Sequence, residues 1–515
     1  MSTSAALPAR ALDDAWRAVL ALTAAITVAR ITVLFLSPLD LYPDEAQYWL
    51  WSRDLAFGYF SKPPVVAWTI WATTAVGGDA EPWIRLASPL YHAGATFAVF
   101  ALARGLYGEA TGLAAAALYG LMPGVQLSAA VMATDAPLLF FMGLALLAYA
   151  RLQSAERRRR GWLAAGFGAA LGLAFLSKYA ATYVVIGLIL HLATSAAARR
   201  AWRSRSAAVA LGACAAVTAP NLLWNADHGF ATLRHTAANA AWGGSQLFNP
   251  PELWDFIASQ FGVFGPIPFA VLLGGAAVMA VRRRLTGADL MLLCFTLPPL
   301  LIVCVQAFIS RANANWSGAA YLPGAVLVAA WLVRWGARRW LTAALALQAA
   351  VAALFLVWVT LPATAEAMGM SNSFKRAKGW SELTRIVLDR AALEPDLTAI
   401  AVNNRFLYNA IAYYGRHDLT RPGAPPLTIW LLAEAPQNQA ETTAPLTRAA
   451  GGRVLAVALE QTYRDRMAAD FARVSGREIV SVRLDEKHHR RAELFIGEGF
   501  APRPRLAFSG PATPP

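Results

Sequence analysis

The chain has 515 residues, of which 57% are hydrophobic and only 15% are charged. A soluble globular protein carries about 25% charged residues, so this composition excludes an ordinary soluble enzyme and places most of the chain in lipid. The formal net charge of +14 is concentrated in arginine clusters between apolar runs, as expected of cytoplasmic loops, which argues against nucleic acid as a partner. The clusters fall at residues 157–160, 199–205, 282–284 and 334–339.

Eleven apolar runs approach or exceed the roughly 20 residues that a membrane-spanning helix needs. The first ends near Leu36 without a small-residue cleavage signal, so we expect a retained helix rather than a removed signal peptide. With the N-terminus in the cytoplasm, all four arginine clusters face the cytoplasm and almost every other polar segment faces the opposite side. The other runs lie near residues 84–104, 112–127, 133–152, 161–177, 179–197, 206–224, 261–281, 288–309, 317–334 and 340–361.

The first large loop, residues 38–83, lies on the outer face and carries the densest group of reactive side chains. Asp44 and Glu45 are adjacent carboxylates, which suit the first turn of a helix and also suit a general base for an incoming hydroxyl. Lys62 stands before two prolines that keep the backbone extended, and it is either a lysine that reaches the lipid head groups or a point charge for a phosphate. Six aromatic residues accompany these charges: Tyr48, Trp49, Trp51, Phe57, Tyr59 and Phe60.

Two more charged residues stand at the outer ends of apolar runs. Asp135 opens the fourth run in the sequence Thr-Asp-Ala-Pro, where it is either a helix cap or a functional group at membrane depth. Lys178 lies between two runs and is either a loop charge or a second phosphate contact.

The outer loop at residues 224–259 contains the only other cluster of potential ligands that we single out. Asp227, His228 and His235 could bind a metal, but their spacing matches no strong template. Arg234 adds a cation that could help to stabilise a phosphate. We find no Walker loop and no dinucleotide-binding fingerprint, and the three cysteines fall inside apolar runs, so we predict neither a nucleotide site nor disulfides.

The tail, residues 364–515, has the composition of a water-soluble domain and follows an odd number of spans, so we expect it on the outer face. Alternating and apolar patterns predict a small α/β domain. The expected strands are 397–402, 427–432, 454–458 and a closing strand at 479–484, and the expected helices are 408–414 and 461–474.

Several of these motifs, in this order, resemble the GT-C glycosyltransferases over roughly residues 15–360. The group that they resemble is family 39-like and includes protein O-mannosyltransferases, the bacterial aminoarabinose-to-lipid-A transferase and rhizobial galacturonosyltransferases of lipopolysaccharide. The matching motifs are the Asp44-Glu45 pair, Lys62-Pro63, Thr134-Asp135-Ala136-Pro137, Ser177-Lys178-Tyr179, the segment from Gln260 to Pro266, and Asn313-Ala314-Asn315-Trp316.

The resemblance implies that Asp44 is the catalytic base, that Glu45 supports it, and that Lys62 contacts the donor phosphate. Lys178 and Arg234 are further candidates for that phosphate. In the aminoarabinose-type members the residue before the lysine is acidic and associated with a metal; here it is Ser61, which leaves a divalent metal only as a possible cofactor. The remaining candidates for the cavity and the acceptor are Tyr48, Tyr59, Asp135, Tyr179, Asn315 and Trp316.

We therefore expect a polytopic α-helical membrane protein of the GT-C type, with a transmembrane part at residues 1–363 and a periplasmic α/β domain at residues 364–515. The expected function is transfer of a sugar from a polyprenyl-phosphate donor to a hydroxyl of lipid A, lipopolysaccharide or another cell-envelope glycan at the bacterial inner membrane. The alternatives are a transporter or flippase of lipid-linked glycans and a protein O-mannosyltransferase. Transporters commonly place charges near the bilayer midplane within repeated, broken helices, and neither pattern is visible in the sequence.

Overall fold

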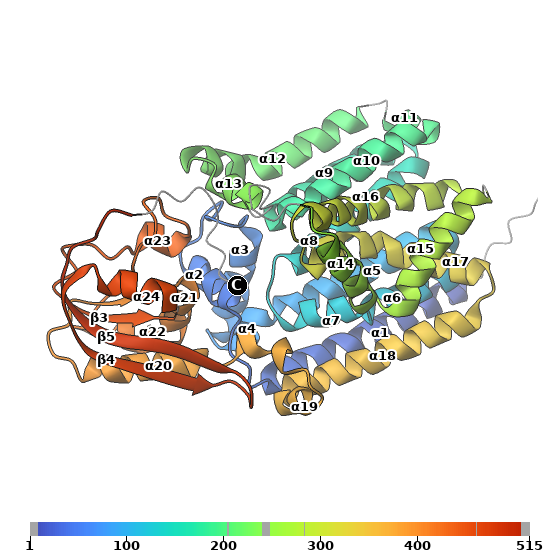
Figure 1. Ribbon diagram of the computed structural model, residues 1–515. Helices are drawn as coiled ribbons and strands as arrows, with labels where there is room; N and C mark the ends of the chain where they lie inside the picture. The colour runs from blue at the N-terminus through green and yellow to red at the C-terminus, as the bar shows by residue number, and fades with distance from the viewer. Residues whose placement is uncertain (1–8, 203–204, 239–247, 283, 460, 506–515) are drawn as a thin grey trace, which may run out of the picture.

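The computed structural model describes residues 9–202, 205–238, 248–282, 284–459 and 461–505. They form a bundle of long helices that is followed in the chain by a small five-stranded sheet, and the two parts lie side by side (Figure 1). The bundle helices up to residue 202 are α1 (Ala9–Leu36), α2 (Pro43–Arg53), α3 (Val65–Gly77), α4 (Glu81–Arg85), α5 (Ala87–Tyr107), α6 (Glu109–Gly120), α7 (Pro123–Ala130), α8 (Asp135–Ser154), α9 (Arg157–Ser177), η1 (Tyr179–Ala181), α10 (Thr182–Thr194) and α11 (Ala196–Trp202). The later ones are α12 (Ser206–Asp227), α13 (Ala231–Ala238), α14 (Pro250–Val263), α15 (Pro266–Val281), α16 (Gly287–Ile309), η2 (Ala314–Ala320), α17 (Tyr321–Arg334), α18 (Arg338–Thr360) and α19 (Pro362–Ala367).

The described part of the chain is a multi-pass membrane protein by its helices. Eight helices are long and apolar enough to cross a membrane, and the number rises to eleven if each of three bent pairs counts as one span. The bends are 54° between α6 and α7, 114° between α10 and α11, and 115° between α14 and α15. Pro123 and Pro266 begin the second helix of two of these pairs, where a missing backbone N–H is tolerated at a helix start. The predicted number of spans is thus the upper value of the observed range.

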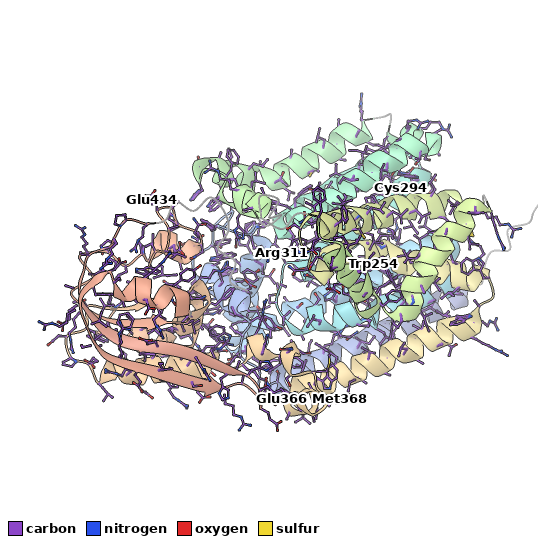
Figure 2. The ribbon with its side chains drawn as sticks, in the orientation of Figure 1. Trp254, Cys294, Arg311, Glu366, Met368 and Glu434 are labelled. Carbon is purple, nitrogen blue, oxygen red and sulfur yellow. The ribbon has the colours of Figure 1, made fainter. Side chains whose placement is uncertain are left out.

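The arginine-rich helix ends lie at one end of the bundle. Figure 1 shows the ends of α11, α15 and α17 on the right, opposite the sheet on the left. The same figure shows that α1 and α18 run beside each other from the arginine-rich end to the sheet end. Glu366 and Met368 mark the region at α19 where the chain leaves the bundle, and Cys294 lies within the bundle in α16 (Figure 2). All three cysteines are free.

The sheet has the strand order β2-β1-β3-β5-β4. β1 is parallel to both β2 and β3, whereas β5 is antiparallel to β3 and β4. One face packs on α20 and α21 and the other on α24, because successive strand residues point to opposite faces. The elements are α20 (Trp380–Ala392), β1 (Ala399–Val402), α21 (Arg405–Tyr414), α22 (Arg416–Leu419), β2 (Leu427–Ile429), α23 (Gln439–Thr443), β3 (Arg453–Ala458), α24 (Gln461–Ala468), β4 (Phe471–Arg483) and β5 (His489–Phe500), with short 3-10 turns η3 (Ser371–Ser373) and η4 (Lys375–Ala377) before α20.

Two expectations for the tail are wrong. The helix predicted at 461–474 ends at Ala468, and the chain then enters β4, which begins at Phe471 and includes the predicted closing strand. The sheet is instead completed by β5, whose first residues are charged and gave no strand pattern. β4 and β5 pair along most of their length, so the pairing, rather than alternation in either segment, defines this hairpin.

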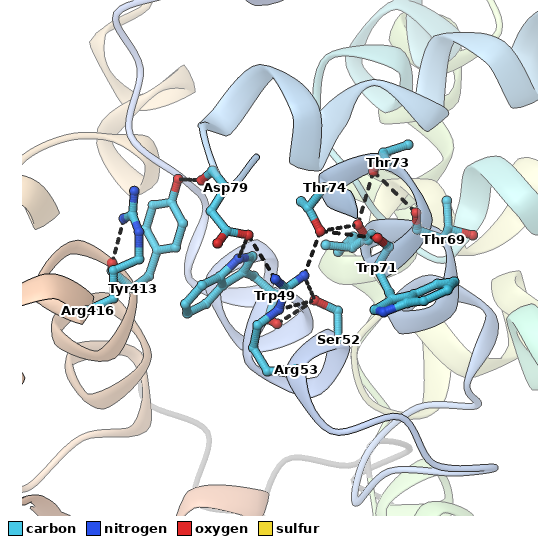
Figure 3. A network of polar contacts seen from close by, with 11 residues as sticks. Trp49, Ser52, Arg53, Thr69, Trp71, Thr73, Thr74, Asp79, Tyr413 and Arg416 are labelled. Carbon is cyan, nitrogen blue, oxygen red and sulfur yellow. Dashed lines mark hydrogen bonds and ion pairs between the residues drawn. The ribbon is translucent and has the colours of Figure 1, made fainter. Parts of the chain in front are cut away.

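The sheet and its helices, from η3 to β5 (residues 371–500), are called the sheet unit below. The sheet unit docks on the opening segment, residues 38–83, which is largely helical rather than a loop. Oδ2 of Asp40 accepts a hydrogen bond from the backbone N–H of Trp380 (2.7 Å) at the start of α20. Tyr413 of α21 donates its hydroxyl to the backbone carbonyl of Asp79 (2.6 Å), and the Asp79 side chain accepts from Trp49 (2.8 Å) and Arg53 (3.0 Å). Figure 3 shows this network joining α21 to α2.

Candidate active site

Glu45 is part of the framework of the opening segment. It is 1% exposed and forms an ion pair with Arg85 of α4, with 2.8 Å between Oε2 and Nη2. Its two oxygens also accept the backbone N–H groups of Met132 (2.8 Å) and Tyr42 (2.9 Å). A buried carboxylate with this many donors is satisfied on all sides. The structure therefore gives Glu45 a role in holding α2, α4 and the link before α8 together.

Asp44 has the opposite environment. It occupies the first turn of α2, as the helix-start interpretation predicted, but its side chain is exposed. No described residue hydrogen-bonds to its carboxylate or pairs with it. Tyr48, one turn further on, is buried, and burial followed by the nearby Asp44 carboxylate raises the pKa of Tyr48 well above its usual value. Asp44 is thus an unengaged acceptor beside a buried phenol.

Lys62 is a cation of the opening segment that interacts electrostatically with this acceptor. Its side chain is half-buried, and within the described ranges it has neither an ion-pair nor a hydrogen-bond partner. Burial is the main cause that lowers the pKa of Lys62; Asp44 and Asp135 oppose this effect, while Lys178 and Arg405 add to it. Four charged groups from distant parts of the chain therefore converge on Lys62.

Asp135 and Lys178 are brought together as an ion pair. The Lys178 ammonium lies 2.8 Å from Oδ1 and 3.1 Å from Oδ2 of Asp135, with both side chains mostly buried. Asp135 begins α8, and Lys178 directly follows α9, so the antiparallel packing of these helices positions both charges. Because each neutralises the other, Lys178 is less available than Lys62 for a substrate anion.

Sequence analysis missed two groups at this site, Arg405 and the inward position of His235. Arg405 is the first residue of α21 in the sheet unit, is half-buried, and lies over the ring of Phe406 at 4.7 Å. His235 of α13 lies edge-on to Phe60, with ring centroids 6.0 Å apart. Burial first, then the charges of Lys62 and Arg405, lower the pKa of His235 to about 4. Only the docking of α13 and α21 on the opening segment reveals these neighbours.

Four aromatic residues of the opening segment, Tyr48, Trp49, Trp51 and Tyr59, are buried in its own core. Tyr59 stacks on Trp51 with ring centroids 4.7 Å apart, and burial raises the pKa of Tyr59 to about 12. Its hydroxyl lies 3.0 Å from the Trp51 carbonyl and accepts from the backbone N–H of Ala56 (3.1 Å). The ring faces of Tyr59 and Trp51 and the Tyr59 hydroxyl are thus used inside the segment, and the role of Tyr59 in the cavity stays a prediction.

The other residues predicted for the cavity are Tyr179, Asn315 and Trp316, and none of them contacts Asp44 or Lys62 among the contacts of the described residues. The Tyr179 hydroxyl donates to Asn221 (3.2 Å) and accepts from Asn225 (3.3 Å), which ties η1 to α12. Asn315 is exposed in η2, and Trp316 packs at the cluster between α14 and α16. Arg234 is exposed on α13 and has no contact with Lys62 among the contacts of the described residues, since the inward face of α13 carries Thr232 and His235.

The predicted metal ligands do not form a cluster. His228 stacks on Trp224 at 4.0 Å and its Nδ1 lies 2.8 Å from the Trp224 carbonyl, whereas His235 faces Phe60. In the part of the chain that the structure describes, no group of three or more His, Cys, Asp or Glu residues could hold a metal ion. Ser61 accepts a hydrogen bond from Gln47 (3.4 Å) where a carboxylate would be needed. The donor set does not fit a metal.

An apolar groove of about 520 Å³ lies on helices that follow or carry these charged groups in the chain. Its walls come from α3, α5, α8 and α9, and α3 begins three residues after Lys62. The Thr69 and Tyr91 hydroxyls form a hydrogen bond (2.8 Å) in its wall. Most of the lining is apolar, with Trp68, Ala72, Leu90, Phe140, Phe141 and Leu173 as examples. An apolar groove of this kind is chemically suited to a hydrocarbon chain.

Comparison with known proteins found relatives similar in sequence and structures similar in fold. The family described as dolichyl-phosphate-mannose-protein mannosyltransferase matches residues 61–224. Lipid A galacturonosyltransferase RgtD of Rhizobium johnstonii is 41% identical over 309 residues, and the match spans 60% of this chain but only 63% of that relative. The crystal structure of ArnT from Cupriavidus metallidurans in the apo state matches with a TM-score of 0.65 at 16% identity, covering 93% of this chain and 97% of ArnT. The same protein bound to undecaprenyl phosphate gives 0.63 at 17% identity, covering 92% and 97%.

The likeness to ArnT shows the fold, and it includes both the helical bundle and the sheet unit because it covers nearly all of each chain. The matches in sequence cover the opening segment from Lys62 onward and the helices that carry Asp135 and Lys178. The chain therefore shares the fold of ArnT, and part of its sequence is similar to the mannosyltransferase family and to RgtD; its membership of the GT-C superfamily stays a prediction.

Proposed function

We propose that this protein transfers a sugar from a polyprenyl-phosphate donor to a hydroxyl of lipid A, lipopolysaccharide or another cell-envelope glycan. The observation that carries the proposal is that a carboxylate without a partner, Asp44, interacts electrostatically with a half-buried cation without a partner, Lys62. Lys62 is followed by α3, which forms part of the wall of an apolar groove. A lipid-linked phosphate has the matching parts, since its chain is apolar and its head is anionic. RgtD and undecaprenyl-phosphate-bound ArnT support this choice of acceptor and donor.

In this mechanism Asp44 is the general base. The acceptor hydroxyl attacks the anomeric carbon, its proton moves to the Asp44 carboxylate, and the bond between that carbon and the phosphate oxygen breaks. One displacement of this kind inverts the anomeric configuration. The electron pair of the broken bond leaves with the lipid phosphate, whose charge Lys62 stabilises.

The groove gives the donor a defined direction. A polyprenyl chain between α3, α5 and α8 would leave the bundle along apolar side chains, with its phosphate at the start of α3 beside Lys62. The Asp135–Lys178 pair lies at the starts of α8 and η1 and would close the other side of this pocket. We assign that pair a positioning role, because both charges are already compensated.

We place the site and the sheet unit on the periplasmic side of the bacterial inner membrane. The support is the arginine-rich end of the bundle opposite the sheet (Figure 1), because arginine clusters in short loops mark the cytoplasmic side. A lipid-linked donor and a glycolipid acceptor would meet there in the outer leaflet.

The proposal is tested with the purified protein in lipid nanodiscs, polyprenyl-phosphate sugars and lipid A. We expect sugar to appear on lipid A and free polyprenyl phosphate to accumulate in equal amounts. Movement of the donor across a vesicle membrane without cleavage would instead identify a flippase. Because the matched family is described by protein mannosylation, a serine- and threonine-containing peptide belongs among the acceptors. Absence of cleavage with every donor and acceptor would refute the proposal.

The sugar itself is left open by this mechanism, because Asp44 and Lys62 act on the hydroxyl and the phosphate only. RgtD is described by galacturonosyl transfer, and a galacturonosyl group carries a carboxylate. A hexuronic acid is therefore one sugar class to include among the donors, beside neutral hexoses.

A further inference from the structure

The sheet unit docks on the opening segment through α21, the helix that begins with Arg405. Asn409, one turn after Arg405 in α21, lies 3.4 Å from Gln47 of α2, and Gln47 lies 3.4 Å from Ser61, the neighbour of Lys62. The backbone N–H of Phe60 donates to Gln439 of α23 (3.0 Å). α21 thus docks on the segment that carries both Asp44 and Lys62, as Figure 1 shows for α21 and α2.

Among the described residues Arg405 forms no ion pair, unlike several other arginines of the sheet unit; the Glu441 carboxylate of α23 acts on it only over a longer distance. Arg390 and Arg453 pair with Glu394, Arg464 with Glu493, and Arg505 with Asp470. Arg405 instead has only the ring of Phe406 beneath it, although it is half-buried at the junction of two parts of the protein. A partly desolvated guanidinium without a direct ion pair is costly to keep, so its position is suited to an anion that arrives with a ligand.

Lys62 and Arg405 are thus two cations without an ion pair that lie within electrostatic range of each other, and they differ in chemistry. Lys62 is a compact point charge, which suits the single phosphate of the donor in the proposed function. Arg405 presents a planar fork of donors, which suits two oxygens of a carboxylate in a bidentate pair. A sugar attached to a phosphate at Lys62 must lie next to Lys62 and Asp44, and this is where α21 brings Arg405.

We propose that Arg405 is a specificity-determining residue that binds the carboxylate of a hexuronic acid on the lipid-linked donor. This inference rests on the proposed function and adds the class of sugar and a role for the sheet unit. It makes the donor site a joint product of the bundle and the sheet unit, with the phosphate held by the former and the sugar selected by the latter.

The test compares two donors that differ only at the carboxylate: polyprenyl-phosphate-linked hexuronic acid and the corresponding neutral hexose. The measured quantity is the ratio of kcat/KM for the two. We expect Arg405→Gln to lower this ratio about 10- to 100-fold, the usual effect of losing a hydrogen-bonded charge partner. Arg405→Lys should fall between the wild type and Arg405→Gln, since it keeps the charge but loses the fork. Arg421→Gln is the matched control, because Arg421 is a largely exposed arginine of the same unit, paired only with Asp418.

Three results would overturn the inference. The ratio could be unchanged in Arg405→Gln, both donors could lose activity equally, or the loss could vanish when the acceptor lacks its phosphates, which would assign Arg405 to the acceptor. Binding of sugar-free polyprenyl phosphate supplies a second measurement, and we expect it to weaken far more in Lys62→Met than in Arg405→Gln. If the wild type transfers neither sugar, both the inference and the proposed function fail. If the wild type transfers hexose and hexuronic acid with equal kcat/KM, only the inference fails.

Discussion

Asp44 and Glu45 are neighbours with the same chemistry and different surroundings. Glu45 points into the protein, where Arg85 and two backbone N–H groups satisfy it, whereas Asp44 is exposed and without a partner in the described structure. A general base needs a free acceptor within reach of the hydroxyl, so only Asp44 meets that requirement. Adjacent residues of a helix lie about 100° apart around its axis, which separates the two roles.

We expect Asp44→Asn to lower kcat by about 10²- to 10⁴-fold, because the amide cannot accept the proton from the acceptor hydroxyl. Donor binding should change little, since Lys62 and the groove are intact. The measurement is steady-state sugar transfer together with binding of polyprenyl phosphate. Asp54→Asn is the control, because Asp54 is an exposed carboxylate at the end of the same helix. Near-normal turnover in Asp44→Asn would rule out Asp44 as the base.

We expect the charged Lys62 side chain to lower the stability of the fold and to raise the rate of sugar transfer. We expect Lys62→Met to lower turnover about 10²- to 10³-fold through loss of a charge that stabilises the leaving phosphate. The same change should raise Tm at neutral pH, because the lowered pKa means that the fold disfavours the charged form of Lys62.

The pH dependence of this difference has a defined sign. Between the lowered pKa of Lys62 in the folded protein and its ordinary value, the unfolded chain binds more protons, so wild-type stability rises with pH. The Tm advantage of Lys62→Met should therefore shrink as the pH rises through this interval. Thermal unfolding of wild type and variant across that range measures it, and an advantage independent of pH would show that the charge of Lys62 is not its cause.

At the scale of elements, the opening segment is fixed by charges that its helices share. Arg85 also donates to the carbonyls of Leu39 (3.2 Å) and Asp40 (2.7 Å), so the Glu45–Arg85 pair connects α4 to the chain before α2. The segment from α2 to α4 is thereby a rigid support on which both the bundle and the sheet unit rest.

Removal of one partner of this pair should be severe. We expect Glu45→Ala to destabilise the protein by about 3–5 kcal/mol, because Arg85 is left buried and uncompensated. Glu45→Leu combined with Arg85→Met should be milder than Glu45→Ala, since the double change removes both charges. Tm measurements on the three proteins decide this. A Glu45→Ala protein with wild-type Tm and impaired kcat would instead restore Glu45 to a catalytic role.

Hydropathy predicted where the chain crosses the membrane but not where its helices break. The three bent pairs fall in runs predicted at 112–127, 179–197 and 261–281, which averaged hydropathy treats as continuous. A bend needs only a local change, such as the Gly265-Pro266 step between α14 and α15, where Gly265 has a positive φ of 100°. The missed strand β5 has the same origin, because its partner β4 and not its own pattern makes it a strand.

At the scale of the whole molecule, the two ends of the bundle differ in charge, and the sheet unit lies at the end with fewer arginines (Figure 1). The domain boundary near residue 364 stays a prediction; the chain there forms α19, directly after α18. Arg405 of the sheet unit acts electrostatically on Lys62 of the opening segment, which is the basis for our proposal that both parts of the protein contribute to one donor site.

Single-cysteine labelling tests the orientation. The variants are made in a background in which the three native cysteines are replaced by alanine. In cells whose outer membrane is permeabilised and whose inner membrane is intact, we expect Glu434→Cys, in the sheet unit (Figure 2), to react with a membrane-impermeant maleimide. Arg339→Cys, at the opposite end, should react only after the inner membrane is permeabilised. The reverse pattern would contradict the periplasmic assignment of the site.

The sequence by itself determined the properties that depend on composition and neighbouring residues. These are the membrane spans, the charge asymmetry of their ends, and the opening segment with Asp44 and Lys62, because lipid solvation and helix starts are read locally. Only the tertiary structure decided which charges are free. Asp135 and Lys178 compensate each other, and Glu45 is neutralised by its ion pair with Arg85. The docking of α21, in which Asn409 contacts Gln47 although 362 positions separate them in the chain, brings Arg405 within electrostatic range of Lys62. Such pairings arise when distant surfaces pack, and no local pattern records them.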